Sequence, residues 1–161
     1  PTRRSSDLIP KIAKELIDRG LCFQWYILGP IAVRDEYNRL EANIEKYSVD
    51  NYVHYLGNKI NPYSYFVNSD LYVCTSESEA CPMVFNEAMI LNTPVVTTNF
   101  GSASEFIHNN KNGFVCDIDG LAKKIFWVLT NDEIYQGLQK ELAESHSFNA
   151  RVLNNINKLF S

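Results

Sequence analysis

The sequence has no excess of basic charge. Its 15 Lys and Arg residues are outnumbered by 19 Asp and Glu, which gives a formal net charge of −4. A surface built to bind nucleic acid or anionic lipid through its phosphates is therefore not indicated. No apolar run approaches the roughly 18 residues that a membrane-spanning helix requires. The N-terminal residues PTRRSSD also lack the apolar segment of a signal peptide.

Cysteine pairs at metal-binding spacing are also absent. The four cysteines, Cys22, Cys74, Cys81 and Cys116, form no C-x-x-C pair, so a zinc site is not indicated. Three of them adjoin apolar runs. We therefore expect reduced, mostly buried thiols, as in a cytosolic protein.

What is present is an ordinary globular composition, with 45% apolar and 12% aromatic residues in a chain of 161. This length predicts one domain with a sizeable core, covering residues 1–161. The chain begins without a methionine and enters a helical pattern almost at once. We therefore expect it to be a piece of a longer polypeptide.

Hydrophobic periodicity predicts strands that alternate with helices. The predicted strands are Leu21–Gly29, Asn51–Gly57, Asp70–Thr75, Thr93–Thr98 and Gly113–Asp117. Six helices are predicted with both ends: Asp7–Arg19, Pro62–Asn68, Ala103–His108, Gly120–Leu129, Asp132–Glu144 and Phe148–Phe160. Two more are predicted, one from the spacing of Tyr37, Leu40, Ile44 and Tyr47, and one that begins at Pro82. This order is typical of an α/β fold, a Rossmann-like doubly wound parallel sheet with helices on both faces. Such sheets bind ligands at the carboxyl ends of their strands.

The stretch SESEACPMVFNEAM, residues 76–89, contains the candidate site. Pro82 suits the first position of a helix, because the N–H group that it lacks would have no helical partner there. Met83, Val84, Ala88 and Leu91 would form the buried face of this helix. Its first N–H groups and the positive end of its dipole would then make a site for an anion such as a diphosphate.

Glu79 and Glu87 flank the start of this predicted helix. A carboxylate accepts hydrogen bonds from two neighbouring hydroxyl groups, so it suits the diol of a ribose or a hexose. Two carboxylates beside an anion site could therefore hold a sugar nucleotide. The alternative is that both glutamates are solvated surface residues, and their spacing alone does not decide between the two readings.

A series of short motifs around this stretch is more specific. Ser76, Glu79, Glu87–Ala88, Pro94–Val95, Gly101, Glu105 and Asn112–Gly113 stand in the order and at the intervals found in glycosyltransferase family 4. Ile27–Gly29 and Asn51–Gly57 resemble two strand-ending turns of the same domain. The chain thus resembles, from about Arg4 to its C-terminus, the C-terminal donor-binding half of these retaining enzymes of GT-B fold.

The resemblance implies a role for each matching residue. Glu87 would bind the ribose of the nucleotide. Glu79 would be the catalytic residue, lying against the transferred sugar and supporting positive charge at its anomeric carbon. The other donor-binding residues that it implies are Arg4, Gly29, Gly57, Asn58, Lys59, Ser76, Ala80, Cys81, Pro82, Met83 and Val84. Arg4 would contact the diphosphate, Asn58 and Lys59 would line the base pocket, and the loop of residues 80–84, except Pro82, would offer backbone N–H groups.

The resemblance also implies a reaction. The donor would be a nucleotide-diphosphate sugar, UDP- or GDP-linked, and no metal or other cofactor would be needed because the helix dipole and cations stabilise the leaving diphosphate. The acceptor would be a saccharide or lipid-linked molecule, as in polysaccharide biosynthesis. The full-length hexosyltransferase would be cytoplasmic. Any association with the inner face of the membrane would be peripheral and would occur through the missing domain.

The sequence departs from the family pattern at several positions. Ala80 replaces a glycine, Cys81 a bulky residue and Asn92 a second glycine. The first strand of the domain and the N-terminal acceptor domain are not seen, so this chain alone is expected to be inactive.

Two other functions remain open from the residues. Glu79 and Glu87 could be the acid and nucleophile of a glycoside hydrolase, which needs two opposed carboxylates in a sugar cleft. The chain could also be a non-catalytic nucleotide-binding or interaction module. We expect His54 and His108 to be structural or solvated, His146 to lie in a C-terminal loop, and Trp25 and Trp127 to be core residues.

Overall fold

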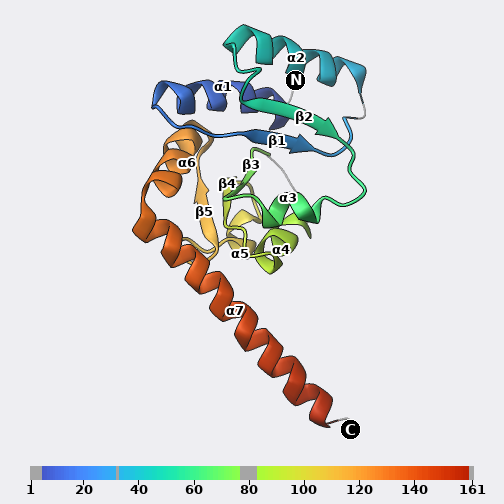
Figure 1. Ribbon diagram of the computed structural model, residues 1–161, viewed down its shortest axis with the longest axis vertical. Helices are drawn as coiled ribbons and strands as arrows, with labels where there is room; N and C mark the ends of the chain where they lie inside the picture. The colour runs from blue at the N-terminus through green and yellow to red at the C-terminus, as the bar shows by residue number, and fades with distance from the viewer. Residues whose placement is uncertain (1–4, 32, 77–82, 160–161) are drawn as a thin grey trace.

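A computed structural model describes residues 5–31, 33–76 and 83–159, with side chains for 7–31, 33–76 and 83–145. The described chain is α/β, and every strand pair in it is parallel (Figure 1). The elements in order are α1 (Ser5–Asp18), β1 (Trp25–Leu28), α2 (Arg34–Tyr47), β2 (Val53–Gly57), α3 (Tyr63–Val67), β3 (Tyr72–Cys74), α4 (Met83–Ile90), β4 (Val95–Thr98), α5 (Ala103–Phe106), β5 (Gly113–Cys116), the 3-10 turn Ile118–Gly120, α6 (Leu121–Thr130) and α7 (Asp132–Leu159). The predicted α/β class and the alternation of strands with helices are confirmed.

The strands form two hydrogen-bonded sheets among the described residues. β1 pairs with β2, and β3, β4 and β5 pair in that order. In the first sheet Trp25 lies opposite Val53, and in the second Val95 lies between Tyr72 and Gly113. Figure 1 shows the β1–β2 sheet beside α1 and α2, with the three-stranded sheet below it.

Helices cover both faces of the three-stranded sheet, because neighbouring residues of a strand point to opposite sides. Val95 packs against Phe85 and Ala88 of α4, and the next residue, Val96, packs against apolar side chains of α1 and α6. Both valines are fully buried. The arrangement is therefore that of a doubly wound α/β fold.

Helix α1 contacts elements of both sheets. Ile9 and Ala13 belong to a cluster with Val53 of β2, and Trp25 and Ile27 of β1 pack against that cluster. Leu8, Ile12 and Leu16 belong to a second cluster, with Val96 of β4 and Phe114 of β5. Since α1 contributes to both clusters, it lies across the gap between the two sheets.

Three expectations for the helices need correction. The Asp132–Glu144 and Phe148–Phe160 patterns belong to one helix, α7, which is 28 residues long and extends away from the sheets (Figure 1). His146 therefore lies within a helix and not in a loop. Ser145–Ser147 is polar, but it contains no Gly or Pro to end the helix. Phe85, not Met83, fills the core side of α4; Met83 is 63% exposed.

The cysteines are less buried than expected. Of the three that the structure describes, Cys74 is buried, Cys116 is half-buried and Cys22 is exposed, and all three are free thiols. Burial raises the pKa of the Cys116 thiol, an effect that nearby Lys124 opposes. Cys81 lies outside the described residues. Trp25 and Trp127 pack against the core cluster as predicted, and no described helix has the length and apolar character to cross a bilayer.

Candidate functional site

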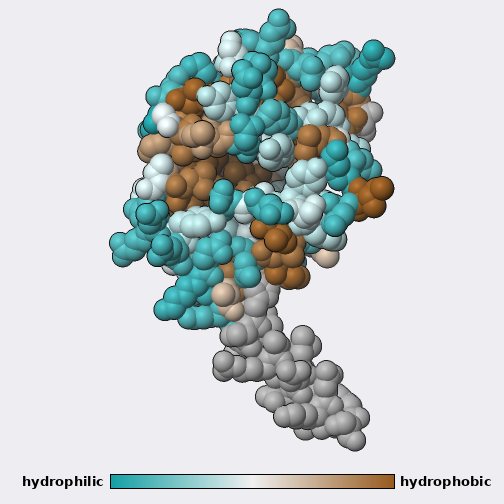
Figure 2. Space-filling view, viewed as in Figure 1, coloured by the Kyte–Doolittle hydropathy of each residue, from teal (hydrophilic) through white to brown (hydrophobic). Residues whose placement is uncertain are grey.

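A cavity of about 840 Å³ extends along β1, from residues 21–24 before the strand to Gly29 after it, and so reaches the carboxyl ends of β1 and β2. Five of the predicted donor-binding residues line it: Gly29, Asn58, Lys59, Val84 and Glu87. They come from the turns after β1 and β2 and from the first two turns of α4. The structure thus brings together residues that lie up to 58 positions apart in the sequence, 29 to 87. Figure 2 shows a hollow with apolar side chains at its base on the viewed face.

Position 29 requires glycine because of its backbone conformation. Its φ angle is +107°, and a Cβ atom built there would meet no atom within 4 Å. The turn is held by two hydrogen bonds: the Gly29 N–H donates to the carbonyl oxygen of Gly57 (3.0 Å), and the hydroxyl of Tyr55 donates to the carbonyl oxygen of Gly29 (3.1 Å). Open space above a fixed backbone lets a ligand pass close to the chain.

Tyr55 joins the two turns, a role that the sequence reasoning missed. Besides bonding Gly29, its hydroxyl oxygen accepts the N–H of Ile31 at 3.1 Å. The ring of Tyr37, from α2, packs against Tyr55 with a centroid distance of 5.6 Å. A hydrogen bond to Glu41 raises the pKa of Tyr37. The sequence did contain a signal for this role: Tyr55 lies inside a predicted strand, and the hydroxyl of a buried tyrosine usually has a polar partner.

Gly57 ends β2 with a φ angle of +65°, in the left-handed region that favours glycine. Asn58 and Lys59 follow it and are exposed, so their polar groups are free to meet a ligand at the mouth of the cavity. Lys59 is the cation among the described cavity-lining residues. A diphosphate or a polar base that enters this end of the cavity meets these side chains first.

Glu87 is half-buried on α4 and lines the same cavity. The hydroxyl of Tyr63, from α3, donates to its Oε1 at 3.4 Å. Asn61 fixes the start of α3, because its Oδ1 accepts the N–H of Tyr63 at 3.1 Å. A carboxylate accepts several hydrogen bonds at once. Glu87 can therefore bind ligand hydroxyls while Tyr63 holds it.

The remaining predicted residues divide into two groups. Ser76 follows β3, and its carbonyl oxygen accepts the hydroxyl of Thr98; Met83 begins α4 and is exposed. Neither lines the cavity as described. The residues Arg4, Glu79, Ala80, Cys81 and Pro82 lie outside the described residues.

Two motif positions have structural explanations. Asn92 ends α4 with a φ angle of +59°, the left-handed conformation that asparagine tolerates better than most residues. A Cβ atom at Gly113 would lie 1.8 Å from the carbonyl oxygen of Val95. The side chain of Asn112 donates to the carbonyl oxygen of Phe106 and accepts the N–H of His108. The Asn112–Gly113 motif is thus a packing motif.

The described residues contain no group of three or more His, Cys, Asp or Glu side chains that could hold a metal ion. Asp117 and Asp119 do form a D-x-D sequence, which the sequence reasoning overlooked. They follow β5 at the 3-10 turn Ile118–Gly120 and do not line the cavity.

Of the two histidines whose side chains are described, His54 has structural side-chain contacts and His108 is exposed. The Nε2 atom of His54 bonds the side-chain oxygen of Gln24, and the His54 ring packs against Tyr26. His108 follows α5, where its backbone bonds Asn112. His54 is therefore a cross-strand partner of β1.

The family model for glycosyl transferases group 1 matches residues 10–145. The chain belongs to this family. A glycosyl transferase relative, the poly(ribitol-phosphate) alpha-N-acetylglucosaminyltransferase of Staphylococcus aureus, is 29% identical over 136 residues, which is 82% of this chain and 27% of that enzyme. The chain thus spans little more than a quarter of the enzyme it matches.

Solved glycosyl transferase structures share the fold. S. aureus TarM, as a mutant in complex with Fondaparinux, alpha-GlcNAc-glycerol and UDP, superimposes with a TM-score of 0.75 at 24% identity, over 96% of this chain and 36% of that one. Anabaena HepE in complex with UDP and glucose gives a TM-score of 0.71 at 20% identity, over 92% and 44%. The chain has the fold of the Rossmann-like C-terminal half of a GT-B glycosyl transferase.

Proposed function

We propose that this chain is the donor-binding part of a retaining glycosyltransferase that uses a nucleotide-diphosphate sugar. The observation that carries the proposal is that Gly29, Asn58, Lys59, Val84 and Glu87 line one and the same cavity. A glycine turn, a lysine and a half-buried carboxylate at one mouth supply what a sugar nucleotide needs: room for close approach, a cation for phosphate and an acceptor for hydroxyls.

The proposal assigns these residues as follows. Glu87 binds the ribose hydroxyls while Tyr63 holds its carboxylate. Asn58 and Lys59 bind the base or phosphate end of the nucleotide, and the first N–H groups of α4 meet the diphosphate. Glu79 and residues 80–82, which lie outside the described residues, keep the roles that the family resemblance implies for them.

The proposed chemistry is glycosyl transfer with retention at the anomeric carbon, by the full-length protein. The bond from the anomeric carbon to the diphosphate breaks, the new bond to the acceptor oxygen forms on the same face of the sugar, and the departing diphosphate oxygen takes the proton of the acceptor hydroxyl. Glu79 supports the positive charge that develops, and the helix dipole and cations stabilise the leaving diphosphate without a metal ion. The acceptor, a saccharide or a lipid-linked molecule, binds mainly to the part of the protein that precedes this chain.

The uridine nucleotides are the first donors to test, since TarM and HepE were each solved with UDP. Titration of the full-length protein with UDP, GDP and ADP should show binding of one nucleotide at micromolar to millimolar concentration. Binding of none of the three would refute the proposed donor class.

Stereochemistry tests the second half of the proposal. With the preferred nucleotide sugar and a saccharide acceptor, the anomeric proton coupling in the product's NMR spectrum should match that of the donor. An inverted linkage would refute retention. Binding of nucleotide without transfer to any acceptor, by the full-length protein, would favour the non-catalytic module over an enzyme.

A further inference from the structure

The turns that follow β1 and β2 each contain a glycine with a positive φ angle, Gly29 at +107° and Gly57 at +65°. A glycine has no side chain through which it could be anchored, and its backbone is more permissive than that of any other residue. Asn58 and Lys59, which come after Gly57, are exposed. A site made of two such turns keeps one shape only if another part of the chain holds them.

An irregularity in the pairing of β1 with β2 brings the two glycines together. Ile27 lies opposite Tyr55, but the next residue of β1 lies opposite Gly57. Leu56 is therefore an extra residue on β2, as in a β-bulge, which bends a strand and changes the direction of a side chain. With this shift the N–H of Gly29 donates to the carbonyl oxygen of Gly57, at 3.0 Å.

The hydroxyl group of Tyr55 holds the turn after β1 at two points. It donates to the carbonyl oxygen of Gly29 and accepts the N–H of Ile31, each at 3.1 Å. Between these two points lies Pro30, whose ring fixes its own φ angle. The turn is thus tied to β2 by the Tyr55 hydroxyl group as well as by the bond between the two glycines.

The ring of Tyr55 has a separate contact. It packs against Tyr37 of α2, with 5.6 Å between the ring centroids and 59° between the ring planes. A phenylalanine at position 55 would keep this packing and would lose only the hydroxyl group. The hydroxyl group is therefore not needed to fill space beside α2, and what it adds is the two bonds to the turn after β1.

The turns that Tyr55 joins meet at the candidate site. Gly29 lines the cavity after β1, and Asn58 and Lys59 line it after β2, whereas Tyr55 itself is not a lining residue. Tyr55 would thus act on a ligand through the turns and not by contact. Turns that are fixed before a ligand arrives lose less conformational freedom on binding, and this raises the affinity.

We propose that Tyr55 is a positioning residue for the nucleoside part of the ligand. Its hydroxyl group fixes the turn after β1 in one conformation and at one place beside Asn58 and Lys59, so that a nucleoside meets a preformed surface. This role rests on the proposed function and adds that the nucleoside, not the diphosphate, lies over Gly29. The hydroxyl group therefore contributes to the binding of a nucleotide and not to the binding of pyrophosphate.

Amide hydrogen exchange in the full-length protein tests the contact itself. In Tyr55→Phe the amide of Ile31 loses its acceptor and should exchange at least about tenfold faster than in wild type. The amide of Val95, bonded to the carbonyl oxygen of Asn112 in the other sheet, is the internal reference and should keep its rate. An unchanged rate at Ile31, or the same increase at Val95, would refute a local role for the hydroxyl group.

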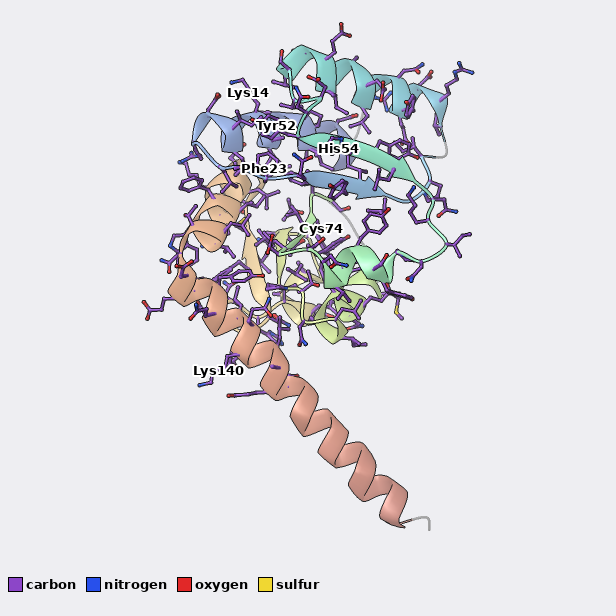
Figure 3. All side chains as sticks on the ribbon, in the orientation of Figure 1. Lys14, Phe23, Tyr52, His54, Cys74 and Lys140 are labelled. Carbon is purple, nitrogen blue, oxygen red and sulfur yellow. The ribbon has the colours of Figure 1, made fainter. Side chains whose placement is uncertain are left out.

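Titration of the full-length protein tests the effect on binding. Tyr55→Phe should weaken binding of the preferred nucleotide among UDP, GDP and ADP by about three- to thirtyfold, and should leave the affinity for pyrophosphate within about twofold of wild type. Tyr52→Phe is the matched control. The Tyr52 ring packs against Phe23 at 5.4 Å, just before β1 and β2 begin and so at the opposite end of their sheet from the turns (Figure 3). This variant should bind both ligands like wild type.

The possible failures are distinguishable. Equal nucleotide affinity in wild type and Tyr55→Phe would refute the positioning role, and an equal loss of pyrophosphate affinity would refute its restriction to the nucleoside. A wild type that binds none of the three nucleotides gives a different result: it refutes the proposed function, and the positioning role with it, even where hydrogen exchange confirms the contact.

Discussion

A substitution at Gly29 distinguishes an effect on folding stability from an effect on nucleotide binding. Its φ angle of +107° disfavours any residue with a Cβ, but the position of that Cβ is open space. Gly29→Ala therefore brings backbone strain without a clash, and we expect it to lower the free energy of unfolding by about 1–3 kcal/mol.

The ligand meets the same open space. If the nucleotide passes close to the Gly29 backbone, the added methyl group occupies its path, and overpacking of this kind costs about 1–3 kcal/mol. The expected loss of nucleotide affinity is roughly five- to 150-fold. Titration calorimetry on the full-length protein measures affinity, and urea unfolding followed by tryptophan fluorescence measures stability.

Gly20 is a matched control. It also has a positive φ angle, +82°, and open space at its Cβ position, but it follows α1 and does not line the cavity. Gly20→Ala should lower stability to a similar extent and leave affinity unchanged. Equal affinity losses in both variants, or none in Gly29→Ala, would refute the placement of the ligand over Gly29.

Three further predictions concern packing, positioning and reactivity. Gly113→Ala should destabilise the chain by about 3 kcal/mol or more, because its Cβ would lie 1.8 Å from a carbonyl oxygen of β4; a loss below that of Gly29→Ala in the same urea experiment would contradict this. Tyr63→Phe should weaken nucleotide binding by only about three- to tenfold, because the 3.4 Å bond that it removes positions the Glu87 carboxylate and does not contact the ligand. Equal weakening of a 2′,3′-dideoxynucleotide would show that the loss of affinity does not involve the ribose hydroxyls. Cys116 should be alkylated by iodoacetamide more slowly than exposed Cys22, and its rate should rise with pH only above the usual range for a thiol, because burial raises its pKa; equal rates at pH 8 would contradict this.

Local patterns were sufficient to predict most of the fold. The strands at residues 25–28, 53–57, 72–74, 95–98 and 113–116 lie inside the predicted ranges, because β-branched and aromatic runs between Gly and Asn turns are strong local signals. The error at His146 has the same origin. A polar stretch looks like a loop, but nothing within Ser145–Ser147 interrupts a helix that has already begun.

The candidate site was predictable only in part. Gly29, Asn58, Lys59 and Glu87 could be named from motifs, because each lies just after a strand or on the helix that follows one. Tyr63 could not, because its contact with Glu87 depends on how α3 and α4 pack. The strands also divide into two sheets, β1–β2 and β3–β4–β5, and no local sequence pattern predicts this division.

Asn92 shows how a departure from a family pattern can preserve the structure. The sequence alone presents it as the loss of a glycine. At a φ angle of +59° after the last turn of α4, asparagine is the residue that best replaces glycine. The substitution therefore changes the residue but leaves the conformation of the helix end unchanged.

The most direct test of the account is a titration of the full-length protein with UDP, comparing wild type, Glu87→Gln and Glu105→Gln. Glu105 is exposed on α5 and does not line the cavity, so it controls for the loss of one negative charge. Hydrogen bonds to a charged group contribute about 1.5–3 kcal/mol, so Glu87→Gln should weaken binding by about ten- to 150-fold. Glu105→Gln should bind like wild type. Wild-type affinity in Glu87→Gln would contradict the assignment of this cavity as the nucleotide site.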